Sequence, residues 1–129
     1  MWPPGVEEVA AAFRAAGVDA RLEELPPDAE SFPGPAVRVE AFDCDGGRLV
    51  ALVPEHGTLD PRKLPCREAR PVDAPSFPFR RATVLVDRLL LTEPVVWMQA
   101  GSPRHVAGLS PALLAQLLRA QAIDLVAEG

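Results

Sequence analysis

The sequence predicts a single α/β domain in which helices flank one mixed sheet. Two observations support this. Segments with strand-like alternation are interspersed with segments of helical periodicity, and 129 residues with 48% hydrophobic and 24% charged side chains suit one domain. No apolar run approaches the roughly 18 residues of a membrane span, and the N-terminus has no basic segment followed by an apolar one. We therefore expect residues 1–129 to form one cytoplasmic domain.

The first quarter of the chain predicts one helix and one short strand. Residues 6–17 carry apolar side chains at helical spacing, and Gly17 suits the end of a helix. A strand is expected at residues 20–25, where two prolines end it. Residues 28–35 have room for at most one helical turn.

The clearest local signal is a β-hairpin. Residues 36–43 alternate, and residues 48–54 return as a more fully buried strand after a turn at Asp45, Gly46 and Gly47. One face of the first strand carries Val37, Val39 and Ala41, and the other carries Arg38, Glu40 and Phe42.

A short helix and a second strand are expected next. Asp60 suits the N-cap of this helix, with Pro61 at its first position. Residues 65–81 are rich in Pro and Arg and predict a loop that includes at most a brief strand. Residues 82–87 read as a strand, and residues 87–91 as a turn of helix.

The last third predicts a buried strand, a tight turn and a helix. Residues 94–100 form the strand, and residues 101–105 (GSPRH) form the turn. Ser110 is expected to cap a helix over residues 110–121. The apolar stripe of this helix is Leu113, Leu114, Leu117 and Leu118.

The charge balance argues against a protein that holds nucleic acid mainly by charge. The net charge is −5, and residues 1–64 carry 6 basic and 12 acidic side chains, whereas residues 65–129 carry 7 and 6. Any phosphate-facing surface should therefore lie in the second half. Of the 13 basic residues 12 are arginine, a bias that a GC-rich genome also produces.

The two cysteines, Cys44 and Cys66, form no CxxC motif, and the chain has only two histidines. A zinc site is therefore not expected, and no other metal or cofactor is indicated. In a cytoplasmic protein, two free thiols are favoured over one disulfide.

The order of these segments resembles the YbaK and prolyl-tRNA synthetase-associated editing domains, which hydrolyse mischarged aminoacyl-tRNA. The resemblance runs through the hairpin AVRVEAFDCDGGRLVALVPEHGTLDPRKL, then PFRRATVLVDRLLL, then VVWMQAGSPRHVAGLSPALLAQL. The last block is the most specific, and the resemblance covers most of the chain. It implies a partly barrel-like sheet, a deacylase activity on small amino acids, and transient binding of a tRNA acceptor end or a synthetase.

The sequence departs from the family pattern at three places. The family's functional lysine is replaced by Arg38, which keeps its proton and therefore cannot act as a base, although it can grip an oxygen. The segment between Leu64 and Phe79 is shortened, which predicts a reduced pocket wall. Pro26 or Pro27 stands where the family has Ser or Thr.

The candidate catalytic residues are Arg38, Gly101, Ser102 and His105. A turn over GSPRH can present main-chain N–H groups to an oxyanion, and His105 has a reference pKa near neutrality. The alternative is that GSPRH only connects two strands. Arg38 would be a substrate clamp, or it would be a solvated residue paired with Glu40.

The candidate substrate-binding residues are Phe79, Arg80, Arg81 and Arg104, which could bracket an acceptor-stem phosphate or form a solvated face. Ser102 is a weak candidate nucleophile, because GSPRH is not a GxSxG motif. The leading function is a deacylase that acts in trans. The alternatives are a degenerate, non-catalytic relative that binds a tRNA end or a protein partner, and a pocket for a free amino acid or nucleotide.

Overall fold

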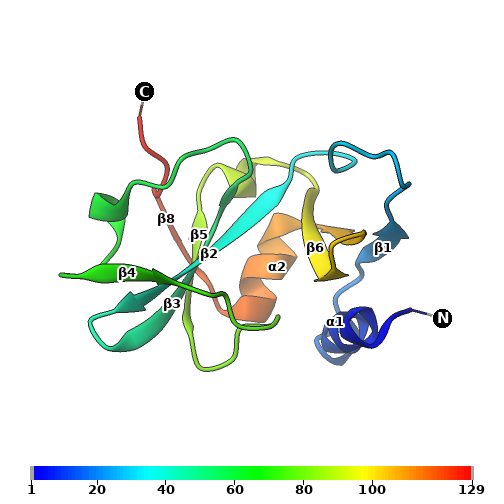
Figure 1. Cartoon of the computed structure of the whole chain (residues 1–129), viewed down its shortest axis with the longest axis horizontal. Helices are drawn as coiled ribbons and strands as arrows, with labels where there is room; N and C mark the ends of the chain where they lie inside the picture. Colours follow the sequence, from blue (N-terminus) through cyan, green and yellow to red (C-terminus); the bar gives the residue numbers. More distant parts are fainter. Residues whose placement is uncertain (1, 129) are drawn as a thin grey trace.

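The structure, a computed structural model, describes residues 2–128, so that Met1 and Gly129, the ends of the predicted domain, lie outside this description. Two α-helices, two short 3-10 helices (η) and eight strands follow one another (Figure 1). In chain order they are α1 (Pro4–Ala15), β1 (Arg21–Glu24), β2 (Val37–Cys44), β3 (Gly47–Pro54), η1 (Pro61–Lys63), β4 (Ala69–Val72), β5 (Thr83–Asp87), η2 (Leu90–Thr92), β6 (Val96–Ser102), β7 (His105–Leu109), α2 (Pro111–Leu118) and β8 (Gln121–Ile123).

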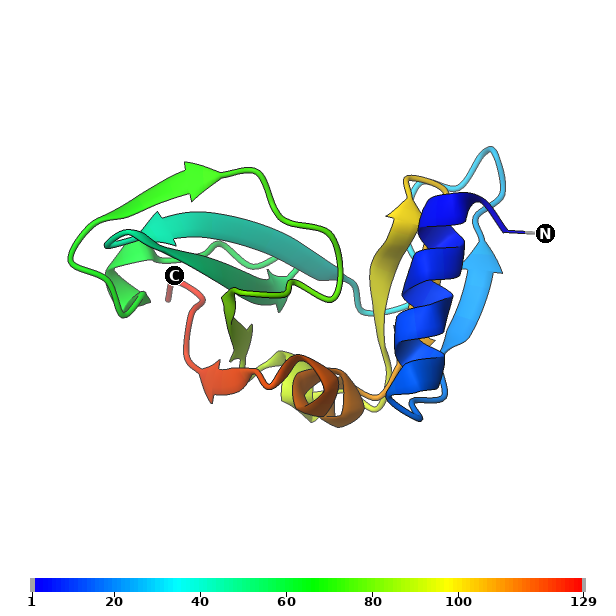
Figure 2. The same ribbon diagram turned by 90° about the horizontal axis from the view of Figure 1, so that it is seen from below.

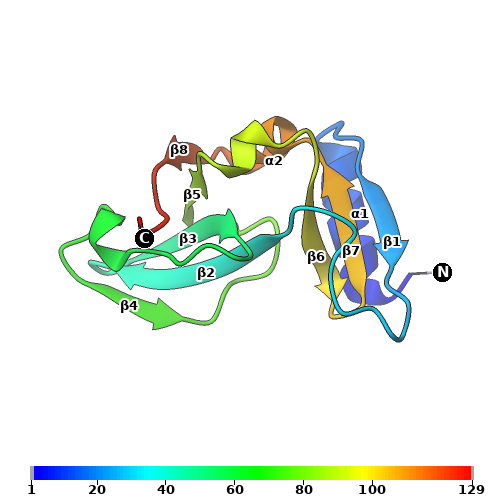
Figure 3. The same ribbon diagram turned by 90° about the horizontal axis from the view of Figure 1, so that it is seen from above.

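The strands form two sheets, neither of which is closed. The small sheet has the order β1-β7-β6, and the large sheet has the order β4-β2-β3-β5-β8. They stand apart in Figures 2 and 3, with α1 against the small sheet. The mixed α/β class is confirmed, but the strands that we expect in one partly barrel-like sheet are divided between two.

Helix α1 packs against the small sheet. This helix begins at Pro4, two residues before the predicted start, because proline suits the first helical position. It ends before Gly17, which has a φ of 67°. Val6, Val9 and Phe13 are buried on its inner side, and its closest strand is β6.

The predicted hairpin is the centre of the large sheet. Strands β2 and β3 pair in antiparallel register, with Cys44 opposite Gly47 across a turn in which Asp45 and Gly46 both have positive φ. β3 pairs in parallel with β5, and β5 in parallel with β8. The brief strand expected within residues 65–81 is β4, which pairs with residues 41–44 of β2.

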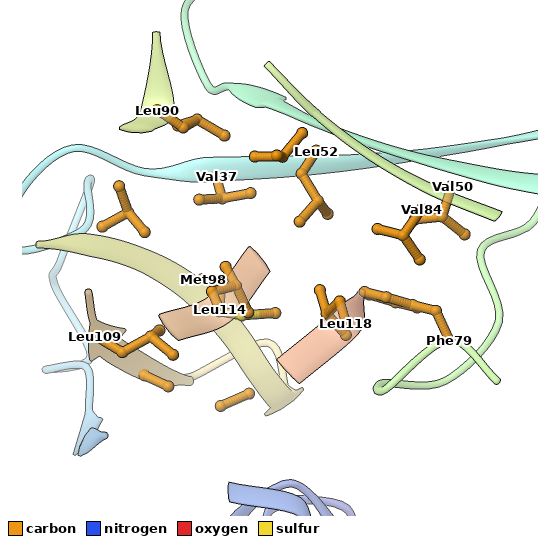
Figure 4. Packing of buried hydrophobic residues seen from close by; sticks show 14 of the residues in the cluster. Val37, Val50, Leu52, Phe79, Val84, Leu90, Met98, Leu109, Leu114 and Leu118 are labelled. Atoms are coloured by element: carbon orange, nitrogen blue, oxygen red, sulfur yellow. The ribbon is translucent and has the colours of Figure 1, made fainter. Parts of the chain in front are cut away.

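Strand β3 is buried on both faces over Leu49–Val53, which explains its continuous apolar run. One face joins α1, α2 and the small sheet in the main core, where Leu52, Met98 and Leu114 meet (Figure 4). The opposite face forms a second core around Phe42 and Leu125.

The predicted caps are confirmed, and one leucine of α2 is misassigned. Asp60 accepts a hydrogen bond from the Arg62 N–H, and Ser110 accepts one from the Leu113 N–H. Leu113, expected in the apolar stripe, is 39% exposed, whereas Leu114 and Leu118 are buried. Within residues 2–128, neither α1 nor α2 has the length and apolar character needed to cross a membrane.

The expectation of two free thiols is wrong, because Cys44 and Cys66 form a disulfide. Their Cα atoms lie 5.4 Å apart, since the chain returns from η1 alongside the end of β2. The neighbouring Asp45 carboxylate accepts hydrogen bonds of 2.9 Å from the Arg67 and Glu68 N–H groups, which hold its pKa below the ordinary value. The start of the Pro-rich segment is therefore fixed to the hairpin.

Removing this disulfide should destabilise the fold. A bond that closes a loop of this length contributes about 3 kcal/mol, chiefly by restricting the unfolded chain. We expect Cys66→Ser, or wild type with a phosphine reductant, to lower the free energy of unfolding in urea by about that amount. Equal stability with and without reductant would contradict this expectation, and a thiol assay on the denatured, unreduced protein should find no free thiol.

The buried Asp87 carboxylate ties the end of β5 to two later segments. It is 1% exposed. Its Oδ1 accepts from the N–H groups of Leu125 (2.8 Å) and Val126 (3.2 Å), and its Oδ2 accepts from the Leu89 N–H (3.0 Å). One side chain therefore satisfies three main-chain donors that have left regular structure.

Asp87→Ala should lower the free energy of unfolding by about 3–5 kcal/mol, because it leaves buried N–H groups unpaired. Asp124→Ala is the matched control: its carboxylate is 60% exposed and pairs with Lys63 at the surface, so its loss should cost under about 1 kcal/mol. Similar losses for the two variants in urea unfolding would refute the role given to Asp87.

Candidate active site

The site is built where the two sheets part. Residue 36, just before β2, forms an isolated parallel bridge to Trp97 of β6, and the Trp97 N–H donates to the Pro35 carbonyl at 2.8 Å. Beyond this point the two strands belong to different sheets. Each therefore presents an unpaired edge toward the other.

On β2, the free edge comprises residues 37–39. β4 pairs only with residues 41–44, so it does not cover them. In an antiparallel ladder closed by a two-residue turn, every second pair exchanges hydrogen bonds. Arg38 is thus bonded to Val53 of β3, and beyond the bridge to Trp97 the N–H and C=O groups of Val39 point to the free edge.

On β6, the residue whose main-chain groups face the other sheet is Gln99. Because the Trp97 N–H points toward the large sheet, the main-chain groups of Gln99, two residues on, face the same way. A register shift between Gln99 and Ser102 then interrupts the pairing with β7. Main-chain donors and acceptors from two strands thus face one space.

That space is a cleft of about 560 Å³. We refer to it as the cleft, and it is lined by Gly5, Glu8, Val9, Phe32, Val37, Arg38, Val39, Glu55, Ala74, Pro75, Ser76, Phe77, Phe79, Met98, Gln99 and Gly101. Its volume lies within the range of small-ligand pockets, and its walls combine apolar side chains with a few polar groups.

Arg38 lines the cleft and is also held by protein groups. Its Nε and Nη2 donate to the Glu40 carboxylate at 3.2 and 2.8 Å, and its Nη1 donates to the Glu55 carbonyl at 2.7 Å. The pairing with Glu40 that the sequence left as an alternative is therefore present. A guanidinium has five N–H donors, and up to four are engaged here when the 3.5 Å contact of Nη1 to the Pro54 carbonyl is included, so at least one N–H is left.

Gly101 lies where β6 meets the first turn of α1. It has a φ of 84°, and a Cβ at this position would overlap the Gly5 carbonyl. Only a residue without a side chain allows the two backbones this approach. Gly101 thus brings the helix to the cleft wall, a role that the sequence did not reveal.

Ser102 and His105 are bonded to each other and are not among the residues that line the cleft. The Ser102 Oγ lies 2.6 Å from the His105 Nδ1 and accepts from the Arg104 N–H at 3.1 Å. His105 is only 7% exposed, and its ring meets the Trp2 ring edge-on at 5.4 Å. These contacts brace the turn beside Gly101.

The four candidate substrate-binding residues are distributed over three places. Phe79 lines the cleft, Arg80 and Arg81 line a second hollow behind it, and Arg104 donates to the Leu25 carbonyl at 3.0 Å. The cleft therefore unites Arg38, Phe79 and Gly101 among the candidates.

Sequence reasoning missed two kinds of cleft residue. Glu8 on α1 and the Phe77 side chain belong to segments that carry no motif, and the β2 edge depends on where β4 stops. The shortened segment still supplies a wall, because residues 74–77 line the cleft. Glu8 and Glu55 make the lining net acidic, since Arg38 is paired with Glu40.

No family model and no curated protein matches the sequence. Solved structures do match. A protein proposed to be a trans-editing enzyme for prolyl-tRNA synthetase is 21% identical with a TM-score of 0.83, and the match covers 99% of this chain and 100% of that one. The chain has the fold of that protein.

Two further structures agree. A scaffold protein used for computational epitope grafting is 23% identical, with a TM-score of 0.83 over 99% of this chain and 100% of the other. A hypothetical protein is 17% identical, with a TM-score of 0.80 over 93% and 99%. The resemblance to the editing domains is therefore confirmed at the level of the fold.

Gly101→Ala should destabilise the protein more than an alanine at an open glycine. Gly46 is the matched control, because it has a φ of 92° and no atom within 4 Å of an added Cβ. We expect Gly46→Ala to cost about 1–2 kcal/mol from the left-handed backbone alone, and Gly101→Ala a further 1–3, roughly, from overlap with Gly5. Equal losses in urea unfolding would show that the close approach adds nothing.

Proposed function

We propose that the chain is an aminoacyl-tRNA deacylase that acts in trans and removes a small amino acid from the terminal adenosine of a mischarged tRNA. The observation that carries the proposal is the meeting of Arg38, Phe79 and Gly101 in one cleft, on a fold shared with a trans-editing protein.

The lining of the cleft suits an aminoacyl ester. The α-ammonium group is cationic, and Glu8 and Glu55 supply carboxylate charge, whereas the lining offers only one cation, Arg38. Unpaired main-chain carbonyl groups of Val39 and Gln99 can accept hydrogen bonds from the α-ammonium group, whatever the side chain of the amino acid is. Val37 and Met98 then contact a small apolar side chain.

Hydrolysis of this ester requires stabilisation of the charge that develops on its carbonyl oxygen. In the proposal, the main-chain N–H of Gly101 and the remaining N–H of Arg38 supply it. Arg38 keeps its proton, so it acts as a clamp and not as a base. A substrate hydroxyl positions the water. Ser102 and His105 act by holding the turn that carries Gly101.

Purified protein should hydrolyse Ala or Cys on the proline acceptor faster than cognate Pro on the same tRNA. Arg38→Ala should lower the rate by about 10- to 100-fold, the effect of one lost charge-assisted hydrogen bond. Arg21→Ala is the matched control, because Arg21 forms the same kind of pair with Glu23 two residues along a strand (3.0 Å) outside the cleft. No turnover across a broad panel of aminoacyl-tRNAs would refute the function.

One observation favours the alternative, a non-catalytic relative that binds a tRNA end. Glu40 and the Glu55 carbonyl already occupy much of the Arg38 guanidinium. If Arg38→Lys gains deacylation that the wild type lacks, this alternative is supported. Substantial wild-type turnover would eliminate it.

A further inference from the structure

The second hollow, which we call the arginine groove, lies behind Phe79. It is an open depression of about 720 Å³ between the last turn of α1, the segment that leads into β5, and the end of α2. Its charged residues are Arg80, Arg81 and Arg119. Phe79 also lines the cleft, so the two hollows have one lining residue in common.

The charge of the groove is the reverse of that of the whole chain. Its lining contains three arginines and no acidic residue, whereas the chain carries −5. Across residues 2–128, no salt bridge or side-chain hydrogen bond engages these three guanidiniums. All three residues are exposed. The groove therefore concentrates arginine forks that are free to bind an anion.

The backbone of the groove is a second, independent observation. Phe79, Arg81 and Arg119 have φ values of 60°, 64° and 53°, and they are three of the four non-glycine residues with positive φ in residues 2–128. Arg119 ends α2 at a position where glycine is the favoured residue. Unfavourable backbone of this kind clusters at functional sites. Arginine at two such positions indicates that its side chain is used.

We propose that the arginine groove binds consecutive phosphates of an RNA strand whose 3′ end enters the cleft. A guanidinium matches a phosphate with two parallel hydrogen bonds, and three guanidiniums in one groove suit the consecutive phosphates of a backbone more than a single ion. The assignment to RNA rests on the proposed function, because the groove and the cleft share Phe79. The cleft itself has an acidic lining and does not suit a phosphate.

The test uses Arg81→Gly and Arg119→Gly, separately and together. Glycine removes the guanidinium and also relieves the left-handed backbone, so the thermal midpoint should stay equal to that of the wild type or rise. The probe is an RNA hairpin with a single-stranded ACCA 3′ end that carries no amino acid. We expect about tenfold weaker binding for each arginine removed. The slope of log K against log[salt] should become shallower by about 0.7–0.9 for each phosphate that no longer pairs with an arginine.

Arg21→Gln is the control for total charge, because Arg21 is an exposed arginine of β1 outside both hollows. Its affinity and salt slope should stay close to those of the wild type. If Arg21→Gln loses as much RNA affinity as the double glycine variant, the proposal that the groove binds RNA is wrong. Unchanged RNA affinity of the double variant would also overturn it.

Two further measurements distinguish RNA binding from binding of a free anion, and the groove from the deacylase activity. If inorganic phosphate at low millimolar concentration displaces the hairpin completely, the groove is a site for a free anion and the RNA assignment fails. Because the hairpin carries no amino acid, its binding does not depend on hydrolysis. Arginine-dependent binding without any deacylation would support the groove and refute the deacylase, and deacylation with unchanged binding by the glycine variants would do the reverse.

Discussion

The isolated bridge between residue 36 and Trp97, which includes the hydrogen bond from the Trp97 N–H to the Pro35 carbonyl, is the one bridge that joins β2 and β6 at their facing edges, within residues 2–128. If β2 and β6 continued to pair beyond it, the strands would form one sheet and the cleft would be filled by their own hydrogen bonds. Instead, β2 and β6 separate beyond the bridge. Gly101 allows the first turn of α1 to pack closely against β6. The cleft therefore exists because β2 and β6 pair at one bridge and then separate.

Local signals in the sequence predicted the local structure well. The turn at Asp45 and Gly46, the caps at Asp60 and Ser110, and the two strands of the hairpin all depend on residues within a few positions of one another. The division into two sheets could not be predicted in this way. It depends on which strands of distant segments pair, and alternation of side chains does not encode the partner.

For the same reason, only part of the arrangement of the candidate residues could be foreseen. Arg38 and Glu40 share a face of one strand, so their pairing could be foreseen, whereas the place of Glu8 depends on how α1 docks. The disulfide was missed because the expected compartment favoured free thiols, whereas the distance between the cysteines is determined by the return of the chain beside β2. Ser102 and His105 proved to be partners of each other.

The Cys44–Cys66 bond has a consequence for ligand binding. The wall of the cleft at residues 74–77 lies on a segment that is covalently anchored at Cys66 and held in the core at Phe79. A wall restrained at both ends has few conformations left to lose when a ligand enters, so the ordering cost is met during folding and not during binding. In the proposed function, the disulfide would therefore favour binding, because it restrains a wall of the cleft that neither cysteine lines.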